Sequence, residues 1–553
     1  MERHTLSLSG RERIALLVVV LVFLVLAGGL IKLQVIDHSE LAAQSENNRI
    51  RVVPIVPQRG RVFDREHRVI IDNRPSYTVS TVAAEEKEGI TLPHLAELID
   101  LDTAQIRKRI GKNIVSRYQP APIRQDIPFE VVAVLEEQNE KFPGVSYQME
   151  RVRQYRSDLG AEPFTGYVGE VSRQEMDAAT QSDLRLGSMI GKKGLERRYD
   201  QILRGREGTQ YIEVNASGQI GGLFEGRPGI PAVAGGDLIL SVDNDLQLAC
   251  VQALDTFCCG AIVAMDPRSG EILGMTSYPG FDANIFSSVI PESLWAEIST
   301  DSTHPLLNRP LTGLYPPGST VKFITVGAGL EEGVIAPGTL FKPCLGGYRF
   351  GNRVFHCWDL GGHGALNAVH ALEQSCDIYM YQLGLKLGID VIARYLSDCG
   401  FGRPTGIDLP GEAAGLAPDS KYYDERYGKG KWTQGLILNN SIGQGEILVT
   451  PLQLTQFFCG LANGGVVYRP HLVKRLVEPS GRVIEPAPVV SFKLPFRQST
   501  LDILTEGLRL VVEGEHGTAR SLRNKRYSVG GKTGTAQNPH GLEHSWFVGV
   551  APL

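Results

Sequence analysis

The sequence of 553 residues lacks several features that would define its class. No second apolar run long enough to cross a bilayer follows residue 31, which excludes a multi-pass transporter or channel. There is no run of basic residues, and the formal net charge of −5 gives no reason to expect nucleic acid as a partner. No low-complexity tract occurs. No cysteine precedes Cys250, so any disulfide or thiolate-bound metal has to lie after that point.

One apolar run is present near the N-terminus. Residues 14–31 read IALLVVVLVFLVLAGGLI, 18 positions without a charged residue, which is long enough for a membrane-spanning helix. Positive charges in front of the run, at Arg3, Arg11 and Arg13, place the N-terminus in the cytoplasm and the rest of the chain outside. The alternative is a cleaved signal peptide, but the run is long for one and no A-x-A-like site follows it. We therefore expect an uncleaved, single-pass anchor.

The length allows two or three domains, and the texture of the chain changes once. We expect a cytoplasmic tail over residues 1–13 and the anchor over 14–36. Residues 37–235 alternate β-like pieces with polar helical stretches and end in a Gly/Pro-rich boundary, so we expect a pedestal domain there. Residues 236–553 contain a strand, a helix and a hairpin, then long helical patterns around 319–333, 365–396 and 451–463, then two strand-like stretches. A sheet with a helical block inserted in sequence predicts an α+β domain.

The stretch YPPGSTVKF at residues 315–323 places Ser319 and Lys322 one helical turn apart. In the simpler interpretation, Ser319 lies near the N-cap of a helix and Lys322 merely shares its face. In the chemical interpretation, the hydroxyl of Ser319 is a nucleophile at a helix N-terminus, and the amine of Lys322 takes its proton. Such a base has to be neutral, so burial and neighbouring cations should lower its pKa.

Two further motifs follow in order. SCD at residues 375–377 lies between helical segments, and Ser375 can relay a proton between an amine and a leaving group. GGKTGT at residues 530–535 lies in a strand-like stretch, where Lys532 is a candidate for the cation that neighbours Lys322.

The residues after Lys532 suit the recognition of a peptide end. Together with Lys532, Thr533 and Thr535 offer a positive charge and two hydroxyls to a terminal carboxylate. Gly534 lets a substrate backbone lie against the strand edge as an added strand. The backbone N–H groups of Ser319 and Thr535 are candidate oxyanion donors. Each motif alone has a simpler structural explanation, but the three in this order favour catalysis.

Taken with these motifs, the chain resembles the class B penicillin-binding proteins, and among them the elongation-type transpeptidases. The resemblance extends over nearly the whole length, through QRGRVFDR (58–65), GYVGEVS (166–172), IGKKGLERRYDQILRGREG (190–208) and SIGQGEILVTPLQL (441–454). It implies an antiparallel sheet with flanking helices, an all-helical subdomain, and a pedestal of the penicillin-binding-protein dimerisation type. It also implies a bacterial inner (cytoplasmic) membrane, with the catalytic domain in the periplasm.

The resemblance implies a serine D,D-transpeptidase that β-lactams acylate. Ser319 would attack the penultimate D-Ala carbonyl of a peptidoglycan stem peptide, and an amine of a neighbouring stem would resolve the acyl-enzyme, with D-Ala-D-Ala carboxypeptidase activity as a side reaction. No cofactor would be needed for this chemistry. No glycosyltransferase-like domain precedes the pedestal, so glycan polymerisation would fall to a RodA-type membrane partner, with an MreC-like scaffold contacting the pedestal.

The chain departs from the family pattern in two places. The second motif ends in Asp377 where most relatives carry Asn, and a carboxylate cannot donate the N–H that an amide gives to a substrate carbonyl. Asp is frequent here in the elongation-type branch, so it favours that branch. Relatives also continue beyond the position of Leu553 with at least a strand and a helix, so we expect a transpeptidase domain that is incomplete at its C-terminus, with an uncovered sheet face and edge.

A cluster of metal-ligand residues lies between the first two motifs. Cys344, Cys357, His363 and Cys376 form C-x12-C-x5-H-x12-C, and three thiolates with one imidazole make a closed, structural zinc set. A Cys344–Cys357 disulfide and a role for His356 in place of His363 are the alternatives. Resemblance favours zinc, because some elongation-type relatives bind it here. A metal at Cys376 would fix the second motif.

Four other functions fit some of these features. A β-lactamase has little use for an anchored pedestal of about 200 residues, a size typical of a whole domain, and a β-lactam sensor would need a cytoplasmic signalling part. The division-type transpeptidase is the nearest alternative, against which SCD and the Cys/His cluster count. A non-catalytic cell-wall scaffold is the remaining one; the presence of Ser319, Lys322 and Lys532 counts against it.

Overall fold

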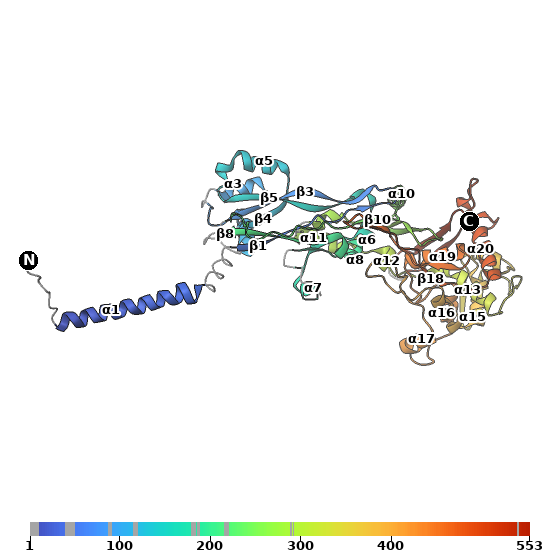
Figure 1. Ribbon diagram of the computed structural model, residues 1–553. Helices are drawn as coiled ribbons and strands as arrows, with labels where there is room; N and C mark the ends of the chain where they lie inside the picture. The colour runs from blue at the N-terminus through green and yellow to red at the C-terminus, as the bar shows by residue number, and fades with distance from the viewer. Residues whose placement is uncertain are drawn as a thin grey trace, which may run out of the picture. The chain divides into compact units, whose positions relative to one another are not determined.

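The structure is a computed structural model (Figure 1). It describes residues 10–38, 50–86, 91–113, 120–178, 184, 188–214, 220–287, 290, 292–538 and 541–553. The apolar N-terminal run forms helix α1 (Gly10–Ile31), which continues as the short π-helix η1 (Lys32–Ile36). Residues 14–36 have a mean hydropathy of 3.2 and are not covered by other parts of the chain. Among the described residues this is the one helix long and apolar enough to cross a membrane.

Beyond the anchor, the chain divides into two compact units. The first contains residues 1–57, 75–150 and 206–233. Its three-stranded antiparallel sheet has the order β1 (Ile50–Ile55), β8 (Gly208–Val214), β9 (Ile220–Leu223). In the same unit, the second half of β3 (Val69–Val82) pairs with β4 (Pro120–Ile127). A core that includes Leu95, Ile106 and Ile123 joins β4 to the helices α3 (Thr91–Leu98), α4 (Thr103–Asn113) and α5 (Phe129–Glu137).

The second unit contains residues 58–74, 151–205 and 234–553, so two segments of the predicted pedestal range group with the transpeptidase range. These segments supply short elements: β2 (Val62–Phe63), the start of β3, the end of β5 (Val145–Tyr155), η3 (Ser157–Leu159), α6 (Glu162–Thr165), β6 (Val168–Glu170), α7 (Arg173–Ala178), β7 (Met189–Gly191), α8 (Gly194–Arg198) and α9 (Asp200–Arg204). Buried Glu196 holds them together, because its carboxylate accepts from Arg59 at 2.7 Å and from Arg153 at 2.6 Å.

The same unit continues the sheet on the other side of β2. Strand β10 (Asp237–Leu240) runs parallel to β2 and antiparallel to β16 (Val473–Val477), which pairs with β17 (Val483–Ile484). A single apolar core lies beneath these strands and includes Val62, Phe164 and Leu195 with Leu240 and Leu452. Burial of this core explains why the pedestal segments 58–74 and 151–205 group with the second unit.

The remainder of the second unit carries the three motifs. Its antiparallel strand pairs are β11 (Gly260–Met265) with β12 (Ile272–Tyr278), β13 (Gly347–Phe350) with β14 (Arg353–His356), β15 (Val466–Tyr468) with β18 (Val490–Lys493), and β19 (Gly530–Ala536) with β20 (His544–Val550). Its helices are α10 (Asn244–Leu254), α11 (Glu292–Thr300), α12 (Arg309–Thr312), α13 (Lys322–Glu331), α14 (Ala368–Glu373), α15 (Asp377–Leu387), α16 (Ile389–Asp398), α17 (Ser420–Tyr427), α18 (Gly435–Ser441), α19 (Pro451–Ala462) and α20 (Gln498–Glu513), with 3-10 turns at η4 (Ala283–Ser287), η5 (Gly318–Val321) and η6 (Arg520–Leu522).

Helix α13 is the centre of the helical part. Every residue from Lys322 to Leu330 is buried, as expected of a helix that is apolar nearly all round. It packs against α15, α16 and α20, and Figure 1 shows these helices gathered at the C-terminal end of the chain. The α+β class and the helical block predicted from the sequence are confirmed.

The helical pattern over 365–396 divides into three helices rather than one. Ser375, with φ of +53°, ends the first of them, and Gly388, with φ of +79°, separates the second from the third. Positive φ cannot be accommodated within an α-helix, so the chain turns at both positions. The first of these turns places the second motif, which is buried, at the beginning of α15.

Candidate active site

The first motif lies on a 3-10 turn, η5, which leads directly into α13. Ser319 is the second residue of this turn and its hydroxyl does not cap the helix, so the N-cap interpretation of Ser319 is wrong. Gly318 has φ of +54°, and a Cβ there would stand 2.7 Å from the carbonyl oxygen of Thr535. Only glycine fits this position without strain. The turn that carries Ser319 therefore lies directly against the third motif on β19.

Lys322 points from α13 to the second motif. Its side chain is fully buried, and Nζ lies 2.7 Å from the backbone oxygen of Ser375, 3.1 Å from Ser375 Oγ and 2.7 Å from Asp377 Oδ1. These three acceptors match the three hydrogens of an ammonium group. Within the described part of the chain, the Ser319 hydroxyl has no hydrogen bond to Lys322 or to another protein group.

Ser375 connects the three motifs. Its Oγ lies 3.1 Å from Lys322 Nζ and 2.9 Å from Lys532 Nζ, so one hydroxyl bridges two amines that are 210 positions apart in the sequence. Its backbone is held in the left-handed region, which costs a residue other than glycine about 1–3 kcal/mol. That conformation presents both the Ser375 carbonyl and its hydroxyl to Lys322. The break between the two helices thus places the Ser375 hydroxyl between the two amines.

Asp377 is oriented by two donors. Oδ1 accepts from Lys322, and Oδ2 accepts the backbone N–H of Trp358 at 3.0 Å. The side chain is about 10 % exposed. An asparagine would have to turn its NH2 group toward one of these donors. The structure therefore gives a local reason for Asp at this position: both of its oxygens face a hydrogen.

The burial of the side chains alternates along the third motif, which lies on β19. Lys532, Gly534 and Ala536 are buried, whereas Thr533 is half-buried and Thr535 is exposed. A Cβ on Gly534 would stand 3.2 Å from Thr320 Cγ2, so the absence of a side chain lets β19 lie close to the turn η5 that carries Ser319. Among the described strands, β19 pairs only with β20.

Two residues that the sequence analysis did not assign complete the surroundings of β19. The hydroxyl of Thr518 lies 2.7 Å from that of Thr533. The amide of Gln444 donates to the Thr535 oxygen and accepts from the N–H of Gln537, both at 3.2 Å. Gln444 therefore occupies part of the edge along which a peptide would add. Gln444 lies within the family-like stretch SIGQGEILVTPLQL, but nothing in that stretch indicates that its side chain would contact β19.

The surroundings of the two amines differ. Burial and the positive charge of Lys322 hold the pKa of Lys532 well below its usual range, although Asp377 acts in the opposite direction. Lys532 is fully buried, and Nζ contacts the Thr533 carbonyl at 2.7 Å besides Ser375. Lys322 has a carboxylate partner and Lys532 has none among the described residues. The arrangement pairs one amine with a carboxylate and biases the other toward the neutral form, with a hydroxyl between them.

The Cys/His cluster is assembled next to this bridge. The ligand atoms of Cys344, Cys357, His363 and Cys376 all lie within 4.8 Å of one another. His363 Nδ1 is 3.5 Å from the sulfurs of both Cys344 and Cys357, while its buried Nε2 has no partner among the described residues. All eight cysteines are free thiols, and His356 is exposed outside the cluster. The disulfide and the His356 alternatives are therefore not what the structure shows.

Comparison with known proteins agrees with this arrangement. Residues 260–553 match the penicillin-binding protein transpeptidase domain, and residues 54–240 match the penicillin-binding protein dimerisation domain. The chain is 33% identical to peptidoglycan D,D-transpeptidase MrdA of Acinetobacter baumannii, covering 98% of this chain and 82% of that protein. It is 31% identical to the MrdA protein of Escherichia coli K12, covering 95% and 84%.

Solved structures show the same likeness. The PBP2 of Helicobacter pylori, in its complex with MreC, superimposes with a TM-score of 0.80 at 27% identity, over 91% of this chain and 93% of that one. A chain of a peptidoglycan synthase complex that coordinates polymerisation and crosslinking matches with a TM-score of 0.70 at 29% identity, over 98% and 91%. With three motifs meeting at one buried hydroxyl and likeness over nearly the whole length, the chain belongs to the class B penicillin-binding proteins, as an elongation-type peptidoglycan D,D-transpeptidase.

Proposed function

We propose that Ser319 is the nucleophile of this transpeptidase and that Lys322, Ser375 and Lys532 move its proton. The observation that carries the proposal is the position of Ser375 Oγ, within 3.1 Å of one amine and 2.9 Å of the other. Gly318 brings the Ser319 turn against the same strand that carries Lys532. The relay hydroxyl and the two amines thus come from three separate segments, and the turn that carries Ser319 adjoins one of these segments.

The protonation states follow from the contacts. In this proposal Lys322, whose three acceptors include the Asp377 carboxylate, serves as the charged amine of the free enzyme, and Lys532, whose pKa is held low by burial, serves as the neutral one. Lys322 passes its proton to Ser375 Oγ while the Ser375 proton goes to Lys532, which leaves a neutral amine at Lys322. A substrate carboxylate favours this exchange, because it stabilises the ammonium that forms at Lys532. Binding of the correct substrate would therefore prepare the base.

Acyl transfer then balances as follows. Neutral Lys322 takes the Ser319 proton as Oγ bonds to the penultimate D-Ala carbonyl carbon, and backbone N–H groups of Ser319 and Thr535 stabilise the oxyanion. The C–N bond breaks when the leaving D-Ala amine receives a proton through Ser375. An acceptor amine attacks the ester by the reverse route. Water in place of that amine would release the stem peptide, which is the proposed D-Ala-D-Ala carboxypeptidase side activity.

We assign the recognition of the terminal carboxylate to the third motif. Exposed Thr535 and half-buried Thr533 lie on the accessible side of β19, and the positive charge comes from Lys532 on the other side. Gly534 keeps the strand without a side chain between the two hydroxyls. The hydroxyl of Thr518 holds Thr533 in place.

We further propose a structural zinc ion held by Cys344, Cys357, His363 and Cys376. The four ligand atoms fit, because tetrahedral Zn–S and Zn–N bonds of about 2.0–2.3 Å place ligands roughly 3.5–4 Å apart. A hydrogen bond from Cys376 lowers the pKa of the Cys357 thiol, which favours a thiolate there. The metal would act by restraining its ligands. Cys376 stands between Ser375 and Asp377, so its restraint would keep the relay hydroxyl in position.

The location and partners are proposed from the anchor and the relatives. Residues 14–36 would hold the protein in the bacterial inner membrane, with residues 37–553 in the periplasm. The relative from Helicobacter pylori is bound to MreC, and another matching chain belongs to a peptidoglycan synthase complex. By analogy, the predicted pedestal, residues 37–235, would contact an MreC-like scaffold, and a RodA-type glycosyltransferase would supply glycan strands.

Labelling with a fluorescent penicillin tests the nucleophile. The wild-type chain should be labelled covalently and Ser319→Ala should not, whereas Ser480→Ala, an exposed serine in a turn of the same unit, should be labelled like the wild type. Mass spectrometry of the labelled peptide should place the adduct on residues 316–322. Equal labelling of the wild type and Ser319→Ala would place the nucleophile elsewhere, and an unlabelled but folded wild type would favour the scaffold function.

A further inference from the structure

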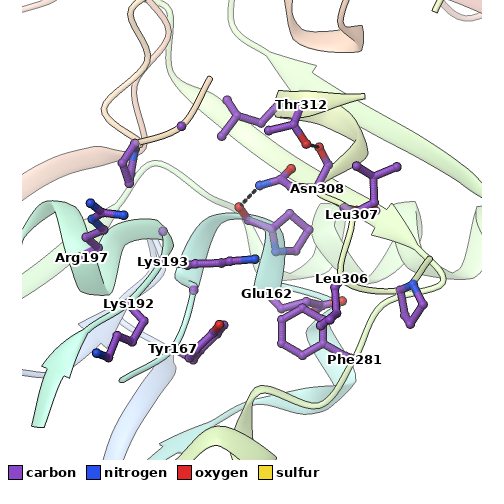
Figure 2. A pocket seen from close by; sticks show the side chains of 18 residues that line it. Glu162, Tyr167, Lys192, Lys193, Arg197, Phe281, Leu306, Leu307, Asn308 and Thr312 are labelled. Atoms are coloured by element: carbon purple, nitrogen blue, oxygen red, sulfur yellow. Dashed lines mark hydrogen bonds between the residues drawn. The ribbon is translucent and has the colours of Figure 1, made fainter. Parts of the chain in front are cut away.

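A cavity of about 250 Å³ lies in the second unit, away from the three motifs (Figure 2). One wall comes from the segments that begin GYVGEVS and IGKKGLERRYD, and includes Tyr167 and Lys193. The opposite wall comes from residues 305–312 and the turn after β12. The transpeptidase chemistry leaves this cavity without a role.

The floor of the cavity is formed by a close crossing of the chain. Gly166 and Gly194 have φ of +66° and +58°, and a Cβ on Gly166 would meet the Lys193 oxygen. Only glycines allow the two segments to approach this closely. The crossing packs the start of α8 against the end of α6, since a Cβ on Gly194 would stand 2.5 Å from the Phe164 oxygen.

The charged groups around the cavity are not paired with one another. Lys192 is neutralised by Glu175 at 2.6 Å, and Figure 2 shows its ammonium turned away from the centre. Lys193 and Arg197, in contrast, have no ion-pair partner among the described residues, and both side chains are exposed to solvent. Glu162 lines the same cavity and accepts the backbone N–H of Phe281. An anionic ligand group would therefore find its counter-charges at Lys193 and Arg197.

A buried acceptor and an apolar wall complete the site. Asn308 donates from Nδ2 to the Pro163 oxygen at 2.6 Å, but its Oδ1 is buried and has no partner in the described part of the chain. Such an orphan acceptor is costly unless a ligand or water donates to it. Phe281, Leu306 and Leu307 supply apolar surface next to it.

We propose that this cavity binds the C-terminal end of a polypeptide whose last residue is apolar. The terminal carboxylate faces Lys193 and Arg197, the last peptide N–H donates to Asn308 Oδ1, and the last side chain packs on Phe281, Leu306 and Leu307. The volume is below that of a drug-sized pocket, which suits one or two residues. A terminal alanine would leave most of the apolar wall uncovered, so the site favours a larger residue.

The test uses the full-length protein in detergent and N-acetyl-L-alanyl-L-leucine as the probe, measured by calorimetry or ligand-observed NMR. The free acid should bind, and its C-terminal amide should bind at least about tenfold more weakly because it lacks the charge-assisted contacts. The double variant Lys193→Gln/Arg197→Gln should lose a similar factor. Lys192→Gln, a matched change at the paired neighbour, should bind like the wild type.

Two further arms separate this site from the transpeptidase cleft. Binding of the probe should be unchanged after the protein has been treated with benzylpenicillin, whether or not acylation of Ser319 occurs, so the result does not depend on the proposed nucleophile. N-acetyl-D-alanyl-D-alanine should bind the cavity more weakly than the leucine probe. Absence of binding, equal binding of acid and amide, loss of binding with penicillin, or unchanged binding in the double variant would each overturn the proposal.

Discussion

Replacement of Asp377 by Asn should damage the enzyme, although the two side chains have nearly the same size and shape. In the structure Lys322 Nζ and the Trp358 N–H each donate to a different oxygen of Asp377, at 2.7 and 3.0 Å. Asp377→Asn removes the charge opposite a fully buried ammonium and turns an NH2 group toward one of the two donors. Breaking a buried pair in this way typically costs 3–5 kcal/mol, and we take about 3 kcal/mol because Asp377 is partly exposed.

That cost has two measurable consequences. The melting temperature of the second unit should fall by roughly 6–12 °C, at about 2–4 °C per kcal/mol for a large domain. The second-order rate constant for acylation by penicillin should fall at least about tenfold, because Asp377 would no longer hold the Lys322 amine against the Ser375 hydroxyl. Asp398→Asn, the same chemical change at an exposed residue, is the control. An Asp377→Asn variant with unchanged melting temperature and acylation rate would refute the ion-pair reasoning.

Three other changes test the remaining features of the structure. Gly318→Ala should abolish most penicillin acylation, because its Cβ would meet the Thr535 oxygen at 2.7 Å. Gly333→Ala is the control for backbone strain alone, about 1 kcal/mol: Gly333 also has a positive φ, +67°, but open space around it, so this variant should be acylated normally. Burial raises the pKa of Glu162 to about 7, so protonation of this side chain stabilises the folded state by about 3 kcal/mol, an effect that is complete below the unfolded pKa near 4.5 and is lost as the pH rises through 7. Glu162→Gln should therefore flatten the dependence of the melting temperature on pH, and an unchanged slope would count against this reasoning. His363→Ala leaves only three thiolate ligands, so metal analysis should find bound zinc lowered from about one to well below one ion per chain, and acylation should be slower. Equal metal content in both proteins would remove the zinc proposal.

Much of the site could be predicted from residue types and order. Ser319, Lys322, Ser375 and Lys532 were identified by motif chemistry, and the structure places the Lys532 and Lys322 amines within hydrogen-bonding distance of Ser375 Oγ. Four metal-ligand residues were selected by their chemistry and are gathered within 4.8 Å. Helix and strand positions near the motifs followed from hydrophobic period and from Gly and Pro placement.

Other features could not be read from the sequence, because they depend on contacts between distant segments. The partners of Lys322 are an example: i to i+3 spacing suggested Ser319, but the ammonium turns to Ser375 and Asp377, more than 50 positions away. The exclusion of His356, the alternative to the predicted His363, likewise required the fold, in which His356 is exposed outside the cluster. Gln444 and Thr518 carry no motif of their own and became visible only beside β19.

Residue types and their order are enough to predict the chemical groups of this protein: an apolar anchor, a serine with two lysines, a second hydroxyl and a set of thiols. Local rules of composition and spacing suffice for that, since each depends on neighbouring residues. Folding was needed to show that burial lowers the pKa of Lys532, that both oxygens of Asp377 face donors, and that two pedestal segments share a core with the second unit. Those outcomes depend on burial and on acceptors contributed by remote parts of the chain, and these arise only once the chain has folded.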